Sequence, residues 1–339
     1  MRWLWLFVLL LLSGCERNST IKAFDTYIQK LANVLGVDTP RMPEAEWLTL
    51  PIKRELEITT PDIRLGLLDA YQLRKCHAFG LIADRNSAMG KVQDEMLRLQ
   101  YELRLLTKLD QCLPIIDDEL KLELQHIKAL KQVQIYHHFW NAITLNQEWQ
   151  QMLRPTTTPF ELNNLHGFAA TEQMLLLLNQ IYSQLEQQQP ISDDLIDALV
   201  TQQKTIQYLD YIGRLYTSMH LSAHYLQSIT QFLTQHDHLI QCGQNTNQQR
   251  AQYLRNVLER YYIDTLQPYL ADINGQYLEL QPLLNGVYTP PSAVSAQFEA
   301  YRQAMILGEV HTRFTDAIGA HTRYWQALFN RCEISVGTR

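Results

Sequence analysis

The longest helical pattern in the chain is Ser192–Ile240, SDDLIDALVTQQKTIQYLDYIGRLYTSMHLSAHYLQSITQFLTQHDHLI. Ser192 followed by two acids is typical of a helix start, and Cys242-Gly243 is typical of a helix end. An unbroken helix of this length would measure about 70 Å. We expect it to bend or split at Gly213. The stretch therefore predicts a fold built from long helices.

Apolar residues at helical spacing recur on both sides of this stretch. They predict further helices over residues 21–35, 61–76, 89–112, 117–154, 160–188, 247–284 and 292–331. Pro268 predicts a kink. The prediction is an all-α bundle of about eight helices, several of them long. The folded domain is expected over 21–339, and the region near 155–190 is where it would subdivide.

Strand patterns are nearly absent from the sequence. The segment Asp38–Pro61 carries Pro40, Pro43, Pro51 and Pro61, and we expect it to cross the body as an extended strap. A brief strand over Leu48–Ile58 is the one strand that the pattern allows.

The composition limits the classes of partner. The chain has 339 residues and a formal net charge of −6. This length is sufficient for a sizeable hydrophobic core. A mildly acidic chain is a poor ligand for nucleic acid, so we expect no nucleic-acid partner.

The first fifteen residues, MRWLWLFVLLLLSGC, have the pattern of an export signal. Arg2 supplies a positive start. Trp3–Leu12 is an apolar run that is too short to span a bilayer, and two small residues follow it. An ordinary secretory signal followed by an unrelated Cys15 is one interpretation of this pattern.

The other interpretation rests on Leu12-Ser13-Gly14-Cys15, which resembles the lipobox of bacterial lipoproteins. The resemblance implies that residues 1–14 are a signal peptide and that the Cys15 sulfur receives a diacylglyceryl group. Two or three acyl chains would hold the protein on a membrane, because each buried methylene contributes about 0.8 kcal/mol. Residues 15–20 would be the lipidated tether. Glu16, where Asp would retain the protein at the inner membrane, indicates the inner leaflet of the outer membrane, facing the periplasm.

Four further cysteines are present: Cys76, Cys112, Cys242 and Cys332. An even number in an exported protein predicts two disulfides, for which three pairings exist. Cys242 and Cys332 each follow a long helical pattern, so we expect helix ends that meet to join them. Cys76 then pairs with Cys112. A zinc site of four thiols is the alternative, although no CxxC spacing supports it.

Three segments carry a resemblance to known sequences. They are Leu81–Ser87 with Gly90-Lys91-Val92, then Asn256–Ala271, and finally His321 with Trp325 and Cys332. With the lipobox, they resemble a family of gammaproteobacterial envelope lipoproteins catalogued only as a domain of unknown function. The resemblance covers nearly the whole mature chain. It implies an envelope location and supplies no activity, substrate or catalytic residue.

The most concentrated polar cluster between apolar helices is Asp84-Arg85-Asn86-Ser87. Arg85 could bind a carboxylate or phosphate, Asn86 and Ser87 could add hydrogen bonds, and a following helix N-terminus would favour anions. The alternative is a turn in which Asn86 or Ser87 caps the next helix while Arg85 pairs with a nearby acid. Gly90-Lys91 is not a P-loop, because Arg occupies position 85 and Val position 92.

Histidines supply the other candidate sites. His321 is a candidate ligand-binding residue. His220 and His224 share a helical face and could bind one metal ion, but their apolar neighbours favour packing. His236-Asp237-His238 lies near a helix end, where a cationic His is favourable. We therefore expect no metal and no cofactor.

Two further patterns bear on function. Tyr261-Tyr262 and Tyr269 form an aromatic band that is typical either of a groove for sugar or peptide or of a packed helix seam. The sequence has no GxSxG motif, so no nucleophile elbow indicates serine-nucleophile catalysis.

The sequence predicts a membrane-anchored periplasmic lipoprotein that acts as a helical scaffold or adaptor for another envelope component, most simply a protein. The alternative is an enzyme or a small-ligand-binding protein with its site around Arg85, Asn86 and His321. Long helices, a short tether and no catalytic motif favour the adaptor.

Overall fold

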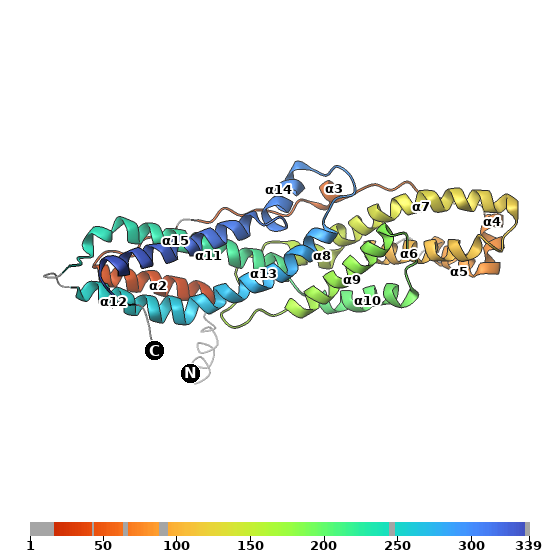
Figure 1. Ribbon diagram of the computed structural model, residues 1–339. Helices are drawn as coiled ribbons and strands as arrows, with labels where there is room; N and C mark the ends of the chain where they lie inside the picture. The colour runs from red at the N-terminus through yellow and green to blue at the C-terminus, as the bar shows by residue number, and fades with distance from the viewer. Residues whose placement is uncertain (1–16, 43, 64–66, 88–93, 244–247, 336–339) are drawn as a thin grey trace, which may run out of the picture.

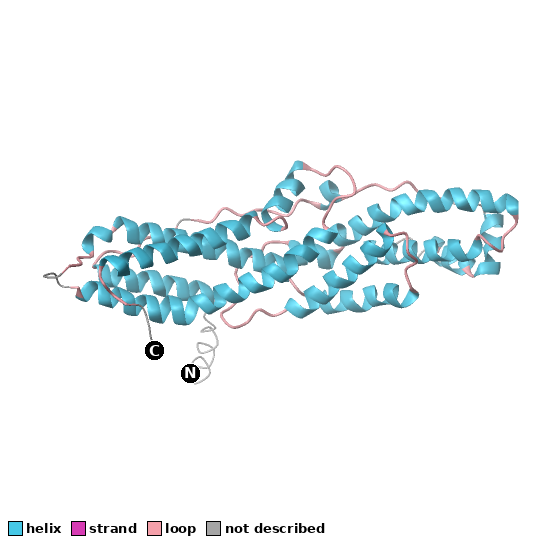
Figure 2. Ribbon diagram, in the orientation of Figure 1, coloured by secondary structure: helices cyan, strands magenta, loops and turns pink. Residues whose placement is uncertain are grey.

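The computed structural model describes residues 17–42, 44–63, 67–87, 94–243 and 248–335. Over these residues the chain is helical with loops between the helices and contains no strand, which confirms the all-α class (Figure 2). The leader, including Cys15, lies outside the described residues. No helix among those described is both long and apolar enough to cross a bilayer.

The first half of the chain forms α2 (Ser19–Leu35), α3 (Lys53–Leu56), α4 (Leu67–Gln72), η2 (Leu73–Cys76), α5 (Ala78–Asn86), α6 (Glu95–Cys112), α7 (Asp118–Leu145) and α8 (Gln147–Leu153). The second half forms α9 (Phe168–Glu186), α10 (Asp193–Ile206), α11 (Tyr211–Gln235), η4 (Asp237–Leu239), α12 (Gln249–Val257), η5 (Leu258–Leu266), α13 (Gln267–Val287), α14 (Ala296–Met305) and α15 (Glu309–Arg331).

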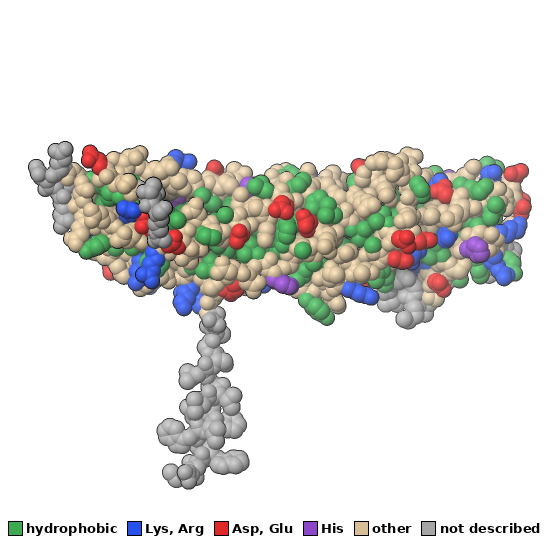
Figure 3. All heavy atoms as spheres, turned by 60° about the horizontal axis from the view of Figure 1, so that its bottom comes forward, with side chains coloured by type: hydrophobic (Ala, Val, Ile, Leu, Met, Phe, Trp, Pro, Cys, Tyr) green, Lys and Arg blue, Asp and Glu red, His purple; other side chains and the backbone are tan. Residues whose placement is uncertain are grey.

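The body is an elongated rod with two halves (Figure 1). We call the half that contains α2, α11, α12, η5 and α15 the proximal half, and the half that contains α4, η2, α5, α6 and α7 the distal half. The helices α8, α9, α10, α13 and α14 connect them. On the face drawn in Figure 3, apolar side chains are exposed along the rod between charged groups of both signs.

Two apolar clusters hold the rod together. The main core joins buried side chains from α2 through α15, and it includes residues within 155–190 and on both sides of this region. A smaller cluster lies in the distal half, between Leu73 and Cys76 on one side and Leu109 and Leu124 on the other. Helices α6 and α7 contribute to both clusters and thereby join the two halves.

The long pattern Ser192–Ile240 divides into α10 and α11, and the break is at residues 207–210 rather than at Gly213. Gly213 lies inside α11, so the chain does not split there. A Cβ at this position would stand 1.8 Å from the Arg154 carbonyl oxygen. Gly213 is therefore explained by the close approach of the chain after α8 to α11.

Other predicted helices also divide or shift. The helix expected from Asp117 to Pro155 breaks at Asn146, whose side chain accepts hydrogen bonds from the Glu148 and Trp149 amides and caps α8. The helix expected over 292–331 breaks before Gly308, which has φ +96° and is the N-cap of α15. At the other end of the chain, Asn18 caps α2, so the folded body begins before residue 21.

The strap passes α11, where Trp47 packs on His220, and then lies along α7. It contains the one-turn helix α3 where a strand was allowed. Side chains of α7 bind its backbone. The Trp140 indole N–H donates to the Leu56 carbonyl at 2.7 Å, and Asn141 exchanges two hydrogen bonds with the Ile58 backbone at 2.8 and 3.0 Å. These side chains satisfy backbone groups that a strand partner would otherwise satisfy.

Both predicted disulfides are present. Cys76 is joined to Cys112 in the distal half, and Cys242 to Cys332 in the proximal half, with Cα–Cα distances of 5.1 and 4.8 Å. Each distance lies within the range that a disulfide spans. The thiol–zinc alternative is therefore wrong.

Candidate functional site

A groove of about 700 Å³ runs along the proximal half between α15 and the continuous helix formed by η5 and α13. We call it the η5–α15 groove. The α15 wall consists of Thr315, Ile318, Thr322, Trp325, Gln326, Phe329 and Asn330. This wall spans fifteen residue steps, or about 22 Å. The opposite wall runs from Leu258 to Asn274.

The groove is apolar at its base and neutral at its edges. Its lining includes Ile263, Leu270 and Ile318, while Gln267, Gln326 and other amides or hydroxyls supply the polar groups. No charged side chain is among the described residues that line it. A charged ligand would therefore find no ion-pair partner along this surface.

One wall of the groove is a π-helix, η5, which leads directly into α13. Pro268 follows it and has no backbone N–H to donate, so the regular i→i−4 ladder cannot continue through this position. The preceding Gln267 amide instead donates to the Tyr262 carbonyl, five residues back. Before Pro268, where a kink was expected, the chain thus forms a widened helical segment, a feature often found at functional sites.

His321 lies beneath the groove and is fully buried. The Trp325 indole N–H donates to its Nε2 at 3.0 Å, and the Tyr27 hydroxyl lies 3.0 Å from the same atom. An indole N–H can only donate, so Nε2 is the acceptor and the proton is on Nδ1, which faces the Thr230 hydroxyl at 2.9 Å. Burial lowers the pKa of His321 to about 3, and the ring is neutral.

These contacts indicate that His321 holds the groove-lining side chains in place and does not itself line the groove. Both ring nitrogens are bound by protein groups, and Trp325 and Tyr262, which pack on the ring, line the groove. Of the predicted aromatic band, Tyr262 thus lies at the groove, whereas Tyr269 is buried in the helix seam.

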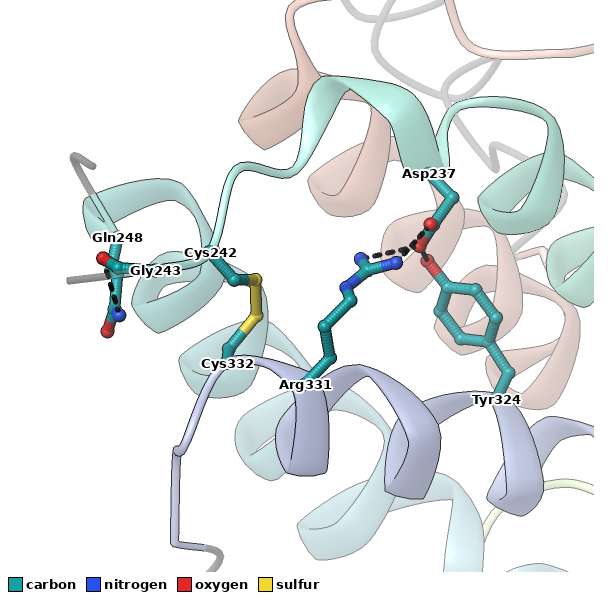
Figure 4. Close-up of a disulfide and its surroundings, with 7 residues drawn as sticks. All are labelled: Asp237, Cys242, Gly243, Gln248, Tyr324, Arg331 and Cys332. Atoms are coloured by element: carbon teal, nitrogen blue, oxygen red, sulfur yellow. Dashed lines mark hydrogen bonds and ion pairs between the residues drawn. A yellow bond between two sulfur atoms is a disulfide. The ribbon is translucent and has the colours of Figure 1, made fainter. Parts of the chain in front are cut away.

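The end of the groove near the C-terminus of α15 is clamped to the end of α11 (Figure 4). The Arg331 guanidinium forms a two-point ion pair with Asp237, at 2.5 and 3.0 Å, and the Tyr324 hydroxyl donates to the same carboxylate at 3.1 Å. The hydrogen bonds from Arg331 are the main reason why the pKa of Asp237 is lowered. The Cys242–Cys332 disulfide closes the same junction one residue beyond Arg331.

The predicted polar cluster lies in the distal half. Arg85 and Asn86, at the end of α5, line a second cavity of about 490 Å³ between α5, α6 and α7. Asp84 and Ser87 are exposed. The Ser87 hydroxyl donates to the Asp84 carbonyl at 2.6 Å, and Ser87 is the C-cap of α5.

The helix that Asn86 or Ser87 was expected to cap would begin at residues 88–93, which lie outside the described residues; the next described helix, α6, has Asp94 as its N-cap. The Asp94 carboxylate accepts from the Leu97 amide at 2.8 Å. What lies across the cavity from Arg85 is the side of α6 and α7.

Glu102 is the centre of a buried charged cluster beside this cavity. It is only 1% exposed and lies 2.8 Å from Arg98 and 2.8 Å from the Lys131 ammonium. His138 Nε2 lies 3.7 Å from the same carboxylate. Burial lowers the pKa of His138 to about 4 despite the opposing effect of Glu102, so the imidazole is neutral. We call Arg98, Glu102, Lys131 and His138 the Glu102 cluster.

The structure separates the residues of the predicted ligand site. Arg85 and Asn86 line the distal cavity, whereas His321 lies beneath the groove in the proximal half (Figure 1 shows α5 and α15 in different halves). These residues do not form one site.

The remaining histidines make local contacts. His220 stacks on Tyr216 at 5.7 Å between ring centroids, and His236 Nδ1 lies 2.9 Å from the Phe232 carbonyl. In the part of the chain that the structure describes, no three His, Cys, Asp or Glu side chains are grouped so that they could hold a metal ion.

The chain is similar to a known protein family. The profile of a family described as "Protein of unknown function (DUF3080)" matches residues 24–336. The chain belongs to this family. The match covers the groove and the distal cavity, and the family description assigns no activity to either. Neither the curated proteins nor the solved structures contain a match.

Proposed function

We propose that this protein is a lipoprotein, anchored through Cys15 to the inner leaflet of the outer membrane, that acts as a helical adaptor in the periplasm. Its partner is an envelope protein that inserts an amphipathic helix into the η5–α15 groove. The groove is the observation that carries this proposal.

The dimensions and chemistry of the groove favour a helix as the ligand. The walls run along about four helical turns, and a partner helix of about fifteen residues would lie in the groove as an additional member of the bundle. Its apolar stripe would cover Ile318, Trp325 and Phe329. The uncharged lining selects a helix whose buried face is also uncharged.

An acyl chain is the other apolar ligand of similar length. It has no polar groups along its length, so it would leave the amide and hydroxyl edges of the groove without partners. A helix with polar residues beside its apolar stripe can bind Gln267, Gln326 and Asn330. The polar edges therefore favour a protein partner.

The anchor rests on the sequence of the leader and on where the folded body begins. Asn18 donates to the Pro159 carbonyl at 3.0 Å, so the chain is already fixed to the body at residue 18. Few residues then separate Cys15 from the body, and the protein would stay close to the lipid surface.

Position-specific photo-crosslinking in cells tests the groove. A photoreactive residue at Gln326, which lines the groove, should give one discrete protein adduct. The matched control is Ala327, the next residue on α15, which is exposed and outside the groove lining. An equal adduct from both positions, or an adduct with lipid alone at Gln326, would contradict the proposal.

Fractionation of cells that express Cys15→Ser tests the anchor separately. The variant should leave the membrane fraction, and the wild type should incorporate labelled palmitate. If Cys15→Ser remains with the outer membrane, the lipoprotein part of the proposal is wrong, whatever the crosslinking shows.

A further inference from the structure

The distal cavity contains a surplus of positive charge. Among the described residues, its lining includes the cations Arg98 and Lys131, and the Glu102 carboxylate lies within ion-pair distance of both. Arg98 and Lys131 thus share the one carboxylate of Glu102. That carboxylate balances only one of the two cations, so one positive charge is left over.

The neighbouring titratable groups do not remove this surplus. His138 is neutral, as its lowered pKa of about 4 indicates, and Tyr101, which also lines the cavity, stays protonated because burial raises its pKa. Neither group adds a negative charge near neutral pH.

The surplus charge is not free to enter bulk water. The Lys131 side chain is 5% exposed and the Arg98 side chain 17% exposed. Arg98 reaches Glu102 from one turn earlier on α6, and Lys131 reaches it from α7. The Arg98 Nε–H is buried and has no hydrogen-bond acceptor. An uncompensated charge in such surroundings is costly, and an anion that replaces the lost water lowers that cost.

Part of the cavity lining is apolar. Leu105 and Leu109 of α6 and Leu124 and Ile127 of α7 line it. The volume of about 490 Å³ exceeds what a bare inorganic anion needs. A ligand that fills the cavity therefore has one charged end and an apolar remainder.

We propose that the distal cavity binds a small amphipathic anion, whose carboxylate or phosphate lies against Arg98 and Lys131 and whose short apolar tail lies against the leucines of α6 and α7. This site is independent of the η5–α15 groove, and either can fail without the other.

Calorimetric titration of the full disulfide-bonded chain in lipid nanodiscs, corrected with empty nanodiscs, tests the site. The probes are 4-phenylbutyrate, its neutral amide 4-phenylbutyramide, and inorganic phosphate. The carboxylate should bind at least about tenfold more tightly than the amide, because a hydrogen bond to a charged group is lost with the amide. Phosphate should bind more weakly than the carboxylate because it has no tail.

Two substitutions in the Glu102 cluster should act in opposite directions. Lys131→Met leaves Arg98 as the one cation paired with Glu102 and should reduce the affinity for 4-phenylbutyrate by about tenfold or more. Glu102→Gln removes a carboxylate, which adds to the surplus of positive charge, and it should increase the affinity for 4-phenylbutyrate. Lys128→Met, one turn earlier on α7, removes a cation that pairs with Asp110 and lines a different cavity, and it should leave the affinity unchanged.

Four results would overturn the proposal: no binding of the carboxylate, equal affinity for the amide, undiminished affinity in Lys131→Met, or reduced affinity in Glu102→Gln. Phosphate binding as tight as that of the carboxylate would overturn the apolar part. If Glu102→Gln does not fold, Arg98→Met replaces it. This variant leaves Lys131 as the one cation paired with Glu102, so undiminished affinity would be a contradiction there as well.

Discussion

The two halves of the rod each bury a polar cluster, and the two clusters differ in charge. In the proximal half, His321 is neutral, and Tyr27, Thr230 and Trp325 engage both of its ring nitrogens. Each of these partners is also neutral. Such a network fixes one arrangement of the helices and leaves nothing for a ligand to satisfy.

In the distal half, the Glu102 cluster is charged and lies beside an open cavity. Its carboxylate cannot neutralise both Arg98 and Lys131. The comparison indicates that the neutral cluster supports the groove from below, whereas the charged cluster faces a site that a ligand can complete.

The largest expected effect is the loss of Glu102. Glu102→Leu leaves two cations buried without a carboxylate and should reduce the free energy of unfolding by about 3–5 kcal/mol. Adding Lys131→Met should restore part of this loss, because one of the stranded charges is removed. Urea denaturation of both variants measures the difference, and equal destabilisation would contradict the ion-pair account.

A smaller loss is expected at His321. His321→Leu replaces the imidazole with an apolar side chain of similar size and leaves the Tyr27 hydroxyl and the Trp325 indole N–H without their acceptor. The unfolding free energy should fall by about 2–4 kcal/mol. Tyr324→Phe is the milder control, because it removes one hydrogen bond to Asp237, which still accepts from Arg331. A loss at His321 no greater than at Tyr324 would show that the network is not structural.

The pH dependence compares the two clusters directly. Burial is the main cause that lowers the pKa of His321 to about 3 and of His138 to about 4, against 6.5 for a free side chain. Below pH 6.5 the unfolded chain binds protons that the folded chain excludes, so stability present above pH 6.5 is lost as the pH falls. Each histidine contributes about 1.4 kcal/mol per pH unit to that loss until its folded pKa is reached.

Replacing either histidine with Gln should therefore make the decline between pH 6.5 and 4 shallower by about 1.4 kcal/mol per pH unit. For His321 the effect should continue below pH 4. Denaturant titrations at successive pH values give the slopes. Unchanged slopes in both variants would mean that other groups cause the acid sensitivity.

The two disulfides give the smallest expected difference. Cys242–Cys332 closes a loop of 90 residues and Cys76–Cys112 one of 36. If loop closure in the unfolded chain dominates, removing the first should cost about 0.8 kcal/mol more than removing the second. Thermal unfolding of the two Cys→Ala pairs makes the comparison, and the opposite order would show that native contacts outweigh loop length.

Local signals in the sequence predicted much of the fold. The helix expected over residues 21–35 is present as α2, and Asn18 and Gly36 cap it as their side-chain and backbone preferences require. The disulfide pairing followed from where the helical patterns end. The break at 207–210 was predicted at Gly213 instead, because a glycine in a helical pattern suggests a break. Gly213 is in fact required by the close approach of Arg154, which is distant in sequence.

The candidate sites were only partly predictable. Arg85 and Asn86 do line a cavity, but pairing them with His321 required knowledge of which helices are neighbours. Glu102 and Lys131 were missed, although each interrupts an apolar helical stripe, which is the signal that could have revealed them. Their significance appears only when α6 and α7 face each other. The η5–α15 groove likewise depends on two helices that the sequence alone does not bring together.

The central claim of the account is that the η5–α15 groove holds a partner protein, and blocking the groove tests it most directly. Ala271 is exposed on the α13 wall, so Ala271→Arg should fill the groove without disturbing the core. In cells, this variant should lose the protein adduct formed from a photoreactive residue at Gln326, while Ala327→Arg on the outer face of α15 should retain it. An adduct of the same size and yield in Ala271→Arg would contradict the claim.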